Sequence, residues 1–180
     1  MSLLHHRVLF SNVGFMTQNM QVPREIELLK QLAGEWSVGI AMKLKEEKYV
    51  SGCGDMSAVE IRDLGVNSEI DTHIEGYEDY YENDLWTFDQ ATGKIHVFSI
   101  TSEGDVHDHV GSWKDDTTIE LNWRGTFEDQ ELEEKIDAKW LSKDQIEVKE
   151  THYSKGETVF TTDYVFKRKG TNQSNLAVPE

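Results

Sequence analysis

Cysteine and proline are scarce in this chain, and long apolar runs are missing from it. The 180 residues include one cysteine, Cys53, and two prolines, Pro23 and Pro179. A single cysteine cannot close an internal disulfide or supply a thiolate cluster for a metal, which favours a reducing compartment. The first residues contain an apolar run of only about four positions, and nothing approaches the ~20 apolar residues of a membrane span. We therefore expect a cytoplasmic protein without a secretory signal or a membrane helix.

Basic residues are also few. Lys and Arg number 18 against 34 Asp and Glu, so the formal net charge is −16. Nucleic acid and anionic membrane surfaces would repel such a chain, and we exclude both as partners. Apolar residues still make up 37% of the sequence, with five Trp, six Tyr and seven Phe, which suffices for a packed interior. The length fits one domain, and we expect a monomer or a homodimer.

A short helix is predicted near the start of the domain. Pro23 suits its first turn, and Gly34 ends it. One apolar side is expected to hold Ile26, Leu28, Leu29 and Leu32. Ten strand-like runs follow, separated by short polar turns and uninterrupted by proline. They lie at 36–44, 49–62, 68–75, 82–88, 94–101, 106–113, 117–127, 132–141, 146–153 and 158–167.

An open sheet of this size would expose two edges and a long apolar face, and closure into a barrel removes both problems. The sequence therefore predicts an all-β fold: a closed antiparallel up-and-down β-barrel of nine to ten strands, with the short N-terminal helix capping one end. We place the barrel domain at residues 23–169. An N-terminal extension is expected at 1–22 and a flexible C-terminal tail at 170–180.

Three stretches carry a family resemblance. The Leu32-Ala33-Gly34-Glu35-Trp36 stretch looks like the Leu-x-Gly-x-Trp opening of lipocalin-like, or calycin-like, barrels. The stretches LWTFDQATGKIHVFSI, GSWKDDTTIELNWRGTF and TTDYVFKRK resemble the bacterial family of uncharacterised lipocalin-like domains. The resemblance implies that the helix plugs one end, that the Trp packs across the barrel floor, and that a small apolar molecule binds inside.

Nitrobindins, haem-binding ten-stranded barrels, are a more distant resemblance. They carry a Gly-x-Trp-x-Gly-x-Gly opening. The corresponding residues here run from Gly34 to Ile40, and the later glycines of that motif do not match. This departure argues against a haem role.

Three of the seven histidines fall within residues 96–109. If the turn at 102–105 holds an even number of residues, opposed residue numbers sum to 207, and His96, His107 and His109 share one face with Phe98 and Trp113. Neighbouring imidazoles on that face would lie roughly 7 Å apart and suit a divalent transition ion. We name His96, His107 and His109 as a candidate metal site. A three-residue turn would move His96 to the opposite face, and ordinary strand histidines are the alternative.

A second polar group ends an apolar strand face. Ile146 and Val148 share their parity with Glu150 and His152, and Tyr164 lies on the apolar face of the following strand. An inward Glu150 requires a partner because an unpaired buried carboxylate is costly. The pair is either an acid–base couple or a structural hydrogen bond. Together with Glu134 and Thr162, these residues are expected to line one end of a cavity, whereas the acidic stretch EGYEDYYEND at 75–84 is predicted to form a loop at the rim.

Aromatic residues exceed what barrel closure needs. We expect a pocket for a small apolar or aromatic molecule, lined by Trp86, Phe98, His107, His109, Trp113, Trp123, Glu150, His152 and Tyr164. The first functional hypothesis is thus a non-enzymatic small-molecule carrier or sensor. The second is a metal- or haem-dependent enzyme that uses the histidine cluster, although no nucleophile or phosphate motif is present and we assign no catalytic residue. The third is an interaction module with a filled barrel and an exposed apolar patch.

Overall fold

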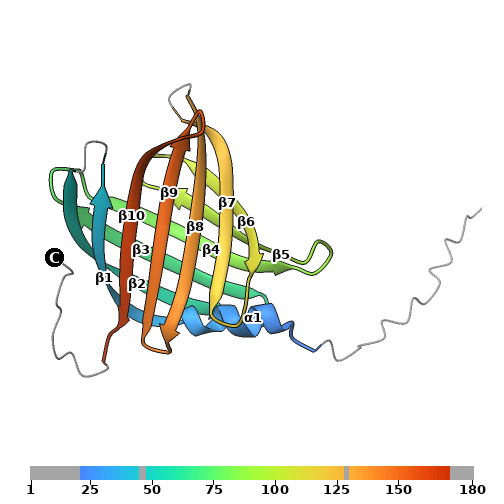
Figure 1. Ribbon diagram of the computed structural model, residues 1–180. Helices are drawn as coiled ribbons and strands as arrows, with labels where there is room; N and C mark the ends of the chain where they lie inside the picture. Colours follow the sequence, from blue (N-terminus) through green and yellow to red (C-terminus); the bar gives the residue numbers. More distant parts are fainter. Residues whose placement is uncertain (1–20, 45–47, 128–129, 171–180) are drawn as a thin grey trace, which may run out of the picture.

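Ten antiparallel strands close into one barrel, as predicted. The computed structural model describes residues 21–44, 48–127 and 130–170 (Figure 1). Most of the predicted N-terminal extension and C-terminal tail lies outside the described residues. The strands are β1 (Gly34–Lys43), β2 (Tyr49–Ile61), β3 (Gly65–Ile74), β4 (Tyr80–Asp89), β5 (Lys94–Thr101), β6 (Val106–Trp113), β7 (Thr118–Phe127), β8 (Gln130–Ser142), β9 (Gln145–Ser154) and β10 (Glu157–Arg168).

Each strand pairs with its sequence neighbours, and β1 closes the barrel by pairing with both β2 and β10. This up-and-down order follows from the short polar turns, which permit only antiparallel connections between adjacent strands. Closure leaves no edge strand to be covered. Side chains consequently alternate between the interior and the outside along every strand.

The helix at the start of the domain covers one end of the barrel. It consists of α1 (Arg24–Leu29) and a 3₁₀ turn, η1 (Lys30–Leu32), and it lies across the lower opening in Figure 1. Of the four apolar residues predicted to share one side, Ile26, Leu29 and Leu32 are buried, whereas Leu28 is partly exposed. Gly34 follows with a positive φ of 131°, a backbone conformation that favours glycine, and there the chain enters β1.

Trp36 forms the floor above this helix. Its side chain is fully buried, and its indole Nε1 donates a hydrogen bond to the Leu32 carbonyl at 2.8 Å. The guanidinium of Arg168, at the end of β10, lies over the indole ring at 4.0 Å and donates to the carbonyls of Ala33 and Gln31 at 2.6 and 2.8 Å. The last strand is thereby fastened to both the floor and the helix.

The half of the interior next to α1 is apolar and closely packed. Val38, Ile40, Met56, Val66, Ile95, Ile119, Leu121, Ala138 and Ile146 are all buried there. The half away from α1 is different, because its inward positions carry acids, histidines and hydroxyl groups. We call that second region the acidic half of the barrel.

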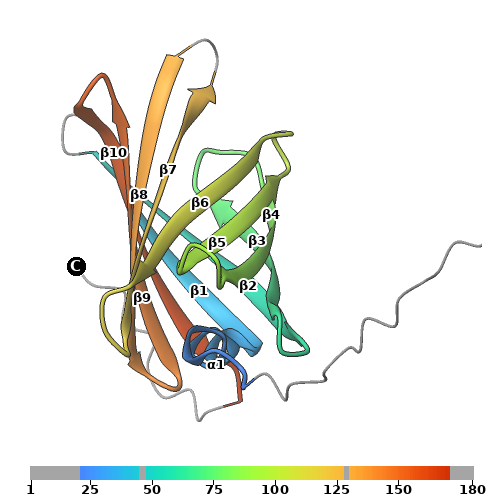
Figure 2. The same ribbon diagram turned by 90° about the vertical axis from the view of Figure 1, so that its right-hand side faces the viewer.

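The barrel wall is weakest between β6 and β7. Only four residue pairs join these strands, from Val110↔Asn122 to Trp113↔Ile119, whereas ten join β7 to β8. Beyond those pairs, toward the end of the barrel opposite α1, the two strands separate from each other (Figure 2). The acidic half therefore lies beside a splayed part of the wall.

The predicted register of the β5–β6 hairpin is wrong by one residue. The strands pair as Val97↔His109 and Ser99↔His107, so opposed numbers sum to 206 rather than 207. The loop has three residues, 102–104, with Gly104 at φ 87° and the Gly104 amide bonded to the Thr101 carbonyl. This is the turn that favours an αL glycine in its last position.

The shift reverses the face of every β5 side chain. His96 and Phe98 point outward, contrary to the prediction that they join His107 and His109. His96 Nδ1 lies 3.0 Å from Asp108 on the outer surface, and the ring of Phe98, 41% exposed, stacks on that of His96. Leu85, Phe98, Ile100 and Val106 form an exposed apolar patch on β4 to β6.

Candidate functional site

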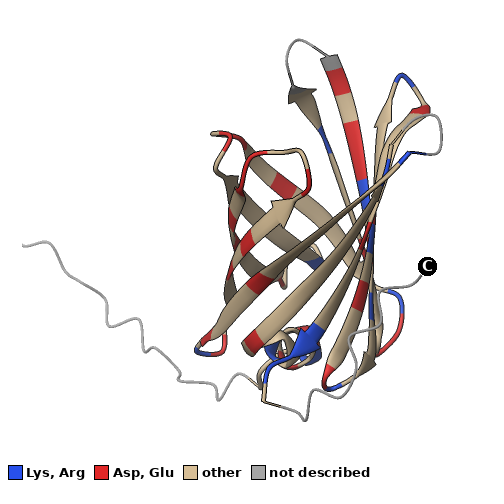
Figure 3. Cartoon of the chain, turned by 90° about the vertical axis from the view of Figure 1, so that its left-hand side faces the viewer, with Lys and Arg blue, Asp and Glu red and all other residues tan. Residues whose placement is uncertain are grey.

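Four carboxylates and three histidines occupy inward positions in the acidic half of the barrel. The strand registers bring together Glu82 and Asp84 from β4, His107 and His109 from β6, Glu134 from β8, and Glu150 and His152 from β9. Acidic side chains occur on strands around the barrel (Figure 3). No Lys or Arg occupies an inward position at this level in the described part of the strands. The carboxylates therefore have only imidazoles and protons to balance them.

His107, His109 and Glu134 form one close group. His109 Nε2 lies 3.1 Å from Glu134 Oε2, and His107 Nδ1 lies 3.9 Å from the same oxygen. The side chains of His109 and Glu134 are only 3% and 4% exposed. Because His107 and His109 stand two residues apart on β6, both rings project from the same face of one strand toward β8.

Burial keeps both of these imidazoles neutral. It is the main cause that lowers the pKa of His109 to about 4, helped by the neighbouring His107. Burial also lowers the pKa of His107. At neutral pH each ring therefore carries a free nitrogen lone pair, the form in which histidine binds metals.

Glu134 also belongs to a second group, with Glu150 and His152. His152 Nε2 lies 3.7 Å from Glu150 Oε2, and the hydroxyl of Tyr164 donates to that oxygen at 2.9 Å. Glu134, Glu150 and His152 place one potential ligand atom each within 4.8 Å of one another, as do His107, His109 and Glu134. Glu134 thus stands between two sets of potential ligands.

The two glutamates hold a proton unequally. Burial, followed by the charge of Glu150, raises the pKa of Glu134 far above its ordinary value. Burial also opposes ionisation of Glu150, but hydrogen bonds from Glu134 and His152 outweigh it and lower the Glu150 pKa. At neutral pH the pair consequently shares one proton, which resides on Glu134.

Glu82 and Asp84 form the β4 side of the acidic half. Ser99 Oγ and Ser68 Oγ donate to the two oxygens of Asp84 at 2.6 and 3.3 Å, and Trp86 Nε1 donates to Ser68 Oγ at 3.0 Å. Burial raises the pKa of Asp84 to about 6 and that of Glu82 well above its usual value. Asp84 is therefore ionised at neutral pH, whereas Glu82 retains its proton.

Aromatic rings support this polar cluster. The indole of Trp123 stacks on His107 with ring centres 4.0 Å apart, and Phe160 stacks on His152 at the same separation. Gly125 makes room for that indole, since a Cβ at position 125 would lie 2.1 Å from Trp123 Cζ2. The rings of His107 and His152 are thus each packed against an aromatic neighbour, which limits their movement.

The structure gathers most of the side chains that the sequence singled out. Inward positions hold Trp86, His107, His109, Trp113, Trp123, Glu150, His152 and Tyr164. His96 and Phe98 are not among them. Trp113 lies lower, against Trp140, with ring centres 4.8 Å apart.

Sequence reasoning missed the β4 acids. The predicted rim loop at 75–84 overlaps the predicted strand at 82–88, and the structure assigns Glu82 and Asp84 to β4, as the strand prediction had it. Their parity is shared with Trp86 and Phe88. The rule that identified Glu150, an apolar face that ends in a carboxylate, would have found them had it been applied to the predicted strand at 82–88.

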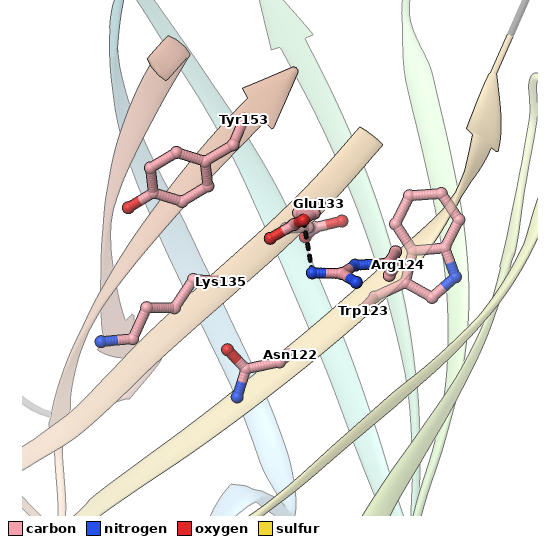
Figure 4. A pocket seen from close by; sticks show the side chains of 7 residues that line it. Asn122, Trp123, Arg124, Glu133, Lys135 and Tyr153 are labelled. Atoms are coloured by element: carbon pink, nitrogen blue, oxygen red, sulfur yellow. Dashed lines mark ion pairs between the residues drawn. The ribbon is translucent and has the colours of Figure 1, made fainter. Parts of the chain in front are cut away.

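A separate hollow of about 520 Å³ lies on the outer side of β7 to β9. Its side chains include Asn122, Arg124, Glu133, Lys135 and Tyr153, which all occupy outward positions (Figure 4). Arg124 and Glu133 form an ion pair across it at 2.5 Å. The predicted binding residues Trp123 and Glu134 reach its lining only from the opposite face of the strands.

No protein-family model and no curated protein sequence matches this chain. Among solved structures, the chain is similar to the S-type phycobiliprotein lyase CPES from Guillardia theta, with a TM-score of 0.59 and 8% sequence identity. The match covers 81% of this chain and 93% of the lyase chain. At this identity the likeness shows the fold alone, a closed antiparallel β-barrel. It leaves membership of the uncharacterised lipocalin-like family as a resemblance. Within the described residues, no helix is long and apolar enough to cross a membrane.

Proposed function

We propose that this protein binds a small molecule in the acidic half of its barrel. The observation that carries the proposal is the exposure of inward-facing side chains. His107, Glu150 and His152 keep 20%, 18% and 17% of their side-chain surface accessible, whereas Trp36 and Leu121 at the other end keep none. Water therefore reaches one half of the interior, and a ligand that displaced this water would contact carboxylate and imidazole groups.

The charges of the acidic half select the chemistry of the ligand. Asp84 and Glu150 are ionised at neutral pH, and a purely apolar molecule would strip water from Glu150, whose side chain is 18% exposed, without replacing it. A molecule with an aromatic ring and a positively charged group suits the site. Its charge would pair with the carboxylates, and its ring would contact Trp86 and Trp123 beside them. We infer an aromatic cation rather than a neutral apolar ligand.

The structural neighbour leaves the choice between carrier and enzyme open. That protein is a lyase by name, so a barrel of this fold serves there as an enzyme. A fold supports many activities, and activity must be argued from the site. The histidine–glutamate groups favour metal-dependent chemistry as the second candidate function, and they are treated below.

A matched ligand series tests the proposal. We would measure the dissociation constants of 2-phenylethylamine, 2-phenylethanol and phenylacetate by isothermal titration calorimetry. These molecules share a ring and differ in charge. We expect the amine to bind tightest and phenylacetate weakest. Replacement of Glu150 by Gln should raise the dissociation constant of the amine by about tenfold, in line with the loss of one charge-assisted hydrogen bond.

Glu147→Gln is the control for Glu150→Gln. Glu147 lies on the same strand, faces outward and is exposed, so its replacement should leave amine binding unchanged. Equal affinity for the amine and the alcohol would contradict the cationic ligand and support an apolar one. Absence of binding by all three molecules would favour the interaction module, which uses the outer surface instead.

A further inference from the structure

We propose that His107, His109 and Glu134 bind one divalent transition-metal ion, such as Zn²⁺, inside the barrel. The inference is independent of the organic ligand proposed above. It replaces the three-histidine site expected from the sequence, because the observed hairpin register removes His96 and the β8 strand supplies Glu134 instead.

The separations between the ligand atoms suit one ion. Ligands bound at about 2.0–2.2 Å in a tetrahedral or octahedral shell lie roughly 2.9–3.6 Å apart when adjacent. His109 Nε2 and Glu134 Oε2 are 3.1 Å apart, and His107 Nδ1 lies 3.9 Å from the same oxygen. All three ligand atoms fall within 4.8 Å of one another. His109 and Glu134 are already spaced as ligands of one ion, whereas His107 Nδ1 would have to move a few tenths of an ångström toward Glu134 Oε2.

His109 gives an independent indication of a ligand. Its side chain is 3% exposed, and its Nε2 is directed at Glu134 without a hydrogen bond of regular geometry to any described residue. A buried imidazole nitrogen without such a bond is costly, because it has lost water and gained nothing in exchange. A metal ion between His109 and Glu134 would satisfy both groups.

Ring packing holds the site close to a binding geometry before an ion arrives. His107 is held between the Trp123 indole, at 4.0 Å, and the edge of the His109 ring, with ring centres 5.4 Å apart. Two histidines and one carboxylate form a ligand set that suits Zn²⁺ and Fe²⁺, and they leave further coordination positions for water or a substrate.

The surrounding charges favour a cation at this place. Glu150 and His152 on β9, Tyr164 on β10, and Glu82 and Asp84 on β4 all face the same interior region. These groups together carry a negative charge that the described interior does not balance with Lys or Arg. An ion that binds Glu134 would displace the proton it shares with Glu150, so binding should release protons to the buffer.

The test is titration of the full chain with Zn²⁺ alone, followed by isothermal titration calorimetry, and with Co²⁺, followed by visible absorption. Adjacent His5 and His6 and the exposed Cys53 are potential adventitious ligands, so every protein should carry His5→Ala, His6→Ala and Cys53→Ser. We expect one ion per chain in this background. His109→Ala and Glu134→Gln should each weaken binding by more than the roughly 10–100-fold cost of an outer-shell change.

Two outer histidines provide matched controls. His73 and His96 each pair with an aspartate, Asp79 and Asp108, on the outside of the barrel. His73→Ala and His96→Ala should leave the affinity unchanged. Far-ultraviolet circular dichroism establishes that each variant is folded, and Glu134→Gln, which keeps the side-chain shape, tests the site if His109→Ala does not fold.

His152→Ala separates the two ligand groups around Glu134. Zn²⁺ affinity within a few-fold of the background supports the site at His107 and His109. Loss of binding in His152→Ala with retention in His107→Ala would overturn it in favour of the β9 group. Absence of stoichiometric binding, or equal loss in the outer-histidine controls, would also overturn it. The metal titrations contain no organic ligand, so their outcomes do not depend on the result of the phenylethylamine series.

Discussion

At the scale of single residues, Asp84 shows how the barrel places a carboxylate where ionisation is unfavourable. Its side chain is 4% exposed, and burial raises its pKa from 3.8 to about 6 despite the hydrogen bonds from Ser99 and Ser68. A group with a raised folded-state pKa contributes most to stability below its unfolded pKa, and the contribution is lost as pH rises through the folded pKa. Asp84 therefore destabilises the protein above pH 6.

Replacement of Asp84 by Asn removes this titration and keeps the side-chain shape. A shift of about two pKa units corresponds to ~3 kcal/mol, from which altered hydrogen bonds subtract, so we expect Asp84→Asn to raise the free energy of unfolding by about 1–2 kcal/mol at pH 8. The gain should shrink between pH 6 and pH 4. Urea denaturation at several pH values measures it. A variant less stable than the parent at pH 8 would show that Asp84 is stabilising when ionised.

Individual residues also show what the sequence could predict of the site. The alternation along β9 correctly placed Glu150 and His152 on the inward face, because side-chain direction in a strand is local information. The contact between His109 and Glu134 joins residues from β6 and β8, with Trp123 of β7 between them, and no local pattern predicts it. The candidate metal site is therefore visible only in the folded barrel.

At the scale of elements, the barrel floor depends on contacts between the two ends of the domain. Arg168 of β10 stacks on Trp36 of β1 and donates to the carbonyls of Ala33 and Gln31. A lysine would keep the charge but lose the planar group that stacks and the forked set of donors. We expect Arg168→Lys to lower the free energy of unfolding by about 1–3 kcal/mol, as for loss of buried, charge-assisted hydrogen bonds.

Arg124→Lys is the control for this prediction. Arg124 pairs with Glu133 on the outer surface and is 75% exposed, so its replacement should change stability by less than about 0.5 kcal/mol. Thermal and denaturant unfolding compare the two variants. Equal, small effects would mean that the floor is held by apolar packing of α1 alone.

Elements also show where sequence-based prediction ended. The helix and the ten strands were predicted correctly because turn residues and alternation mark each of them. The face of His96 depended on whether the β5–β6 loop holds two or three residues, and one residue reverses a whole strand. The predicted rim loop extended over the start of β4 and overlapped the strand predicted at 82–88, because the acids and tyrosines there lack an apolar alternation.

At the scale of the whole molecule, the barrel combines two interiors in one chain. The half next to α1 is packed with apolar side chains, and the other half gathers four carboxylates beside a splayed part of the wall between β6 and β7. The interaction-module hypothesis expected a filled barrel, whereas solvent reaches inward side chains here, although the exposed patch of Leu85, Phe98, Ile100 and Val106 fits it. Whether the chain is a monomer or a homodimer stays a prediction.

The central claim is that the acidic half of the barrel takes up a cation. Native mass spectrometry of the full chain carrying His5→Ala, His6→Ala and Cys53→Ser, with Zn²⁺ or 2-phenylethylamine added in turn, tests it most directly. We predict that at least one of these cations adds a single equivalent to the protein, and that Glu134→Gln combined with Glu150→Gln abolishes the addition while Glu147→Gln does not. Identical spectra for the parent and the double variant, with neither cation retained, would contradict the account.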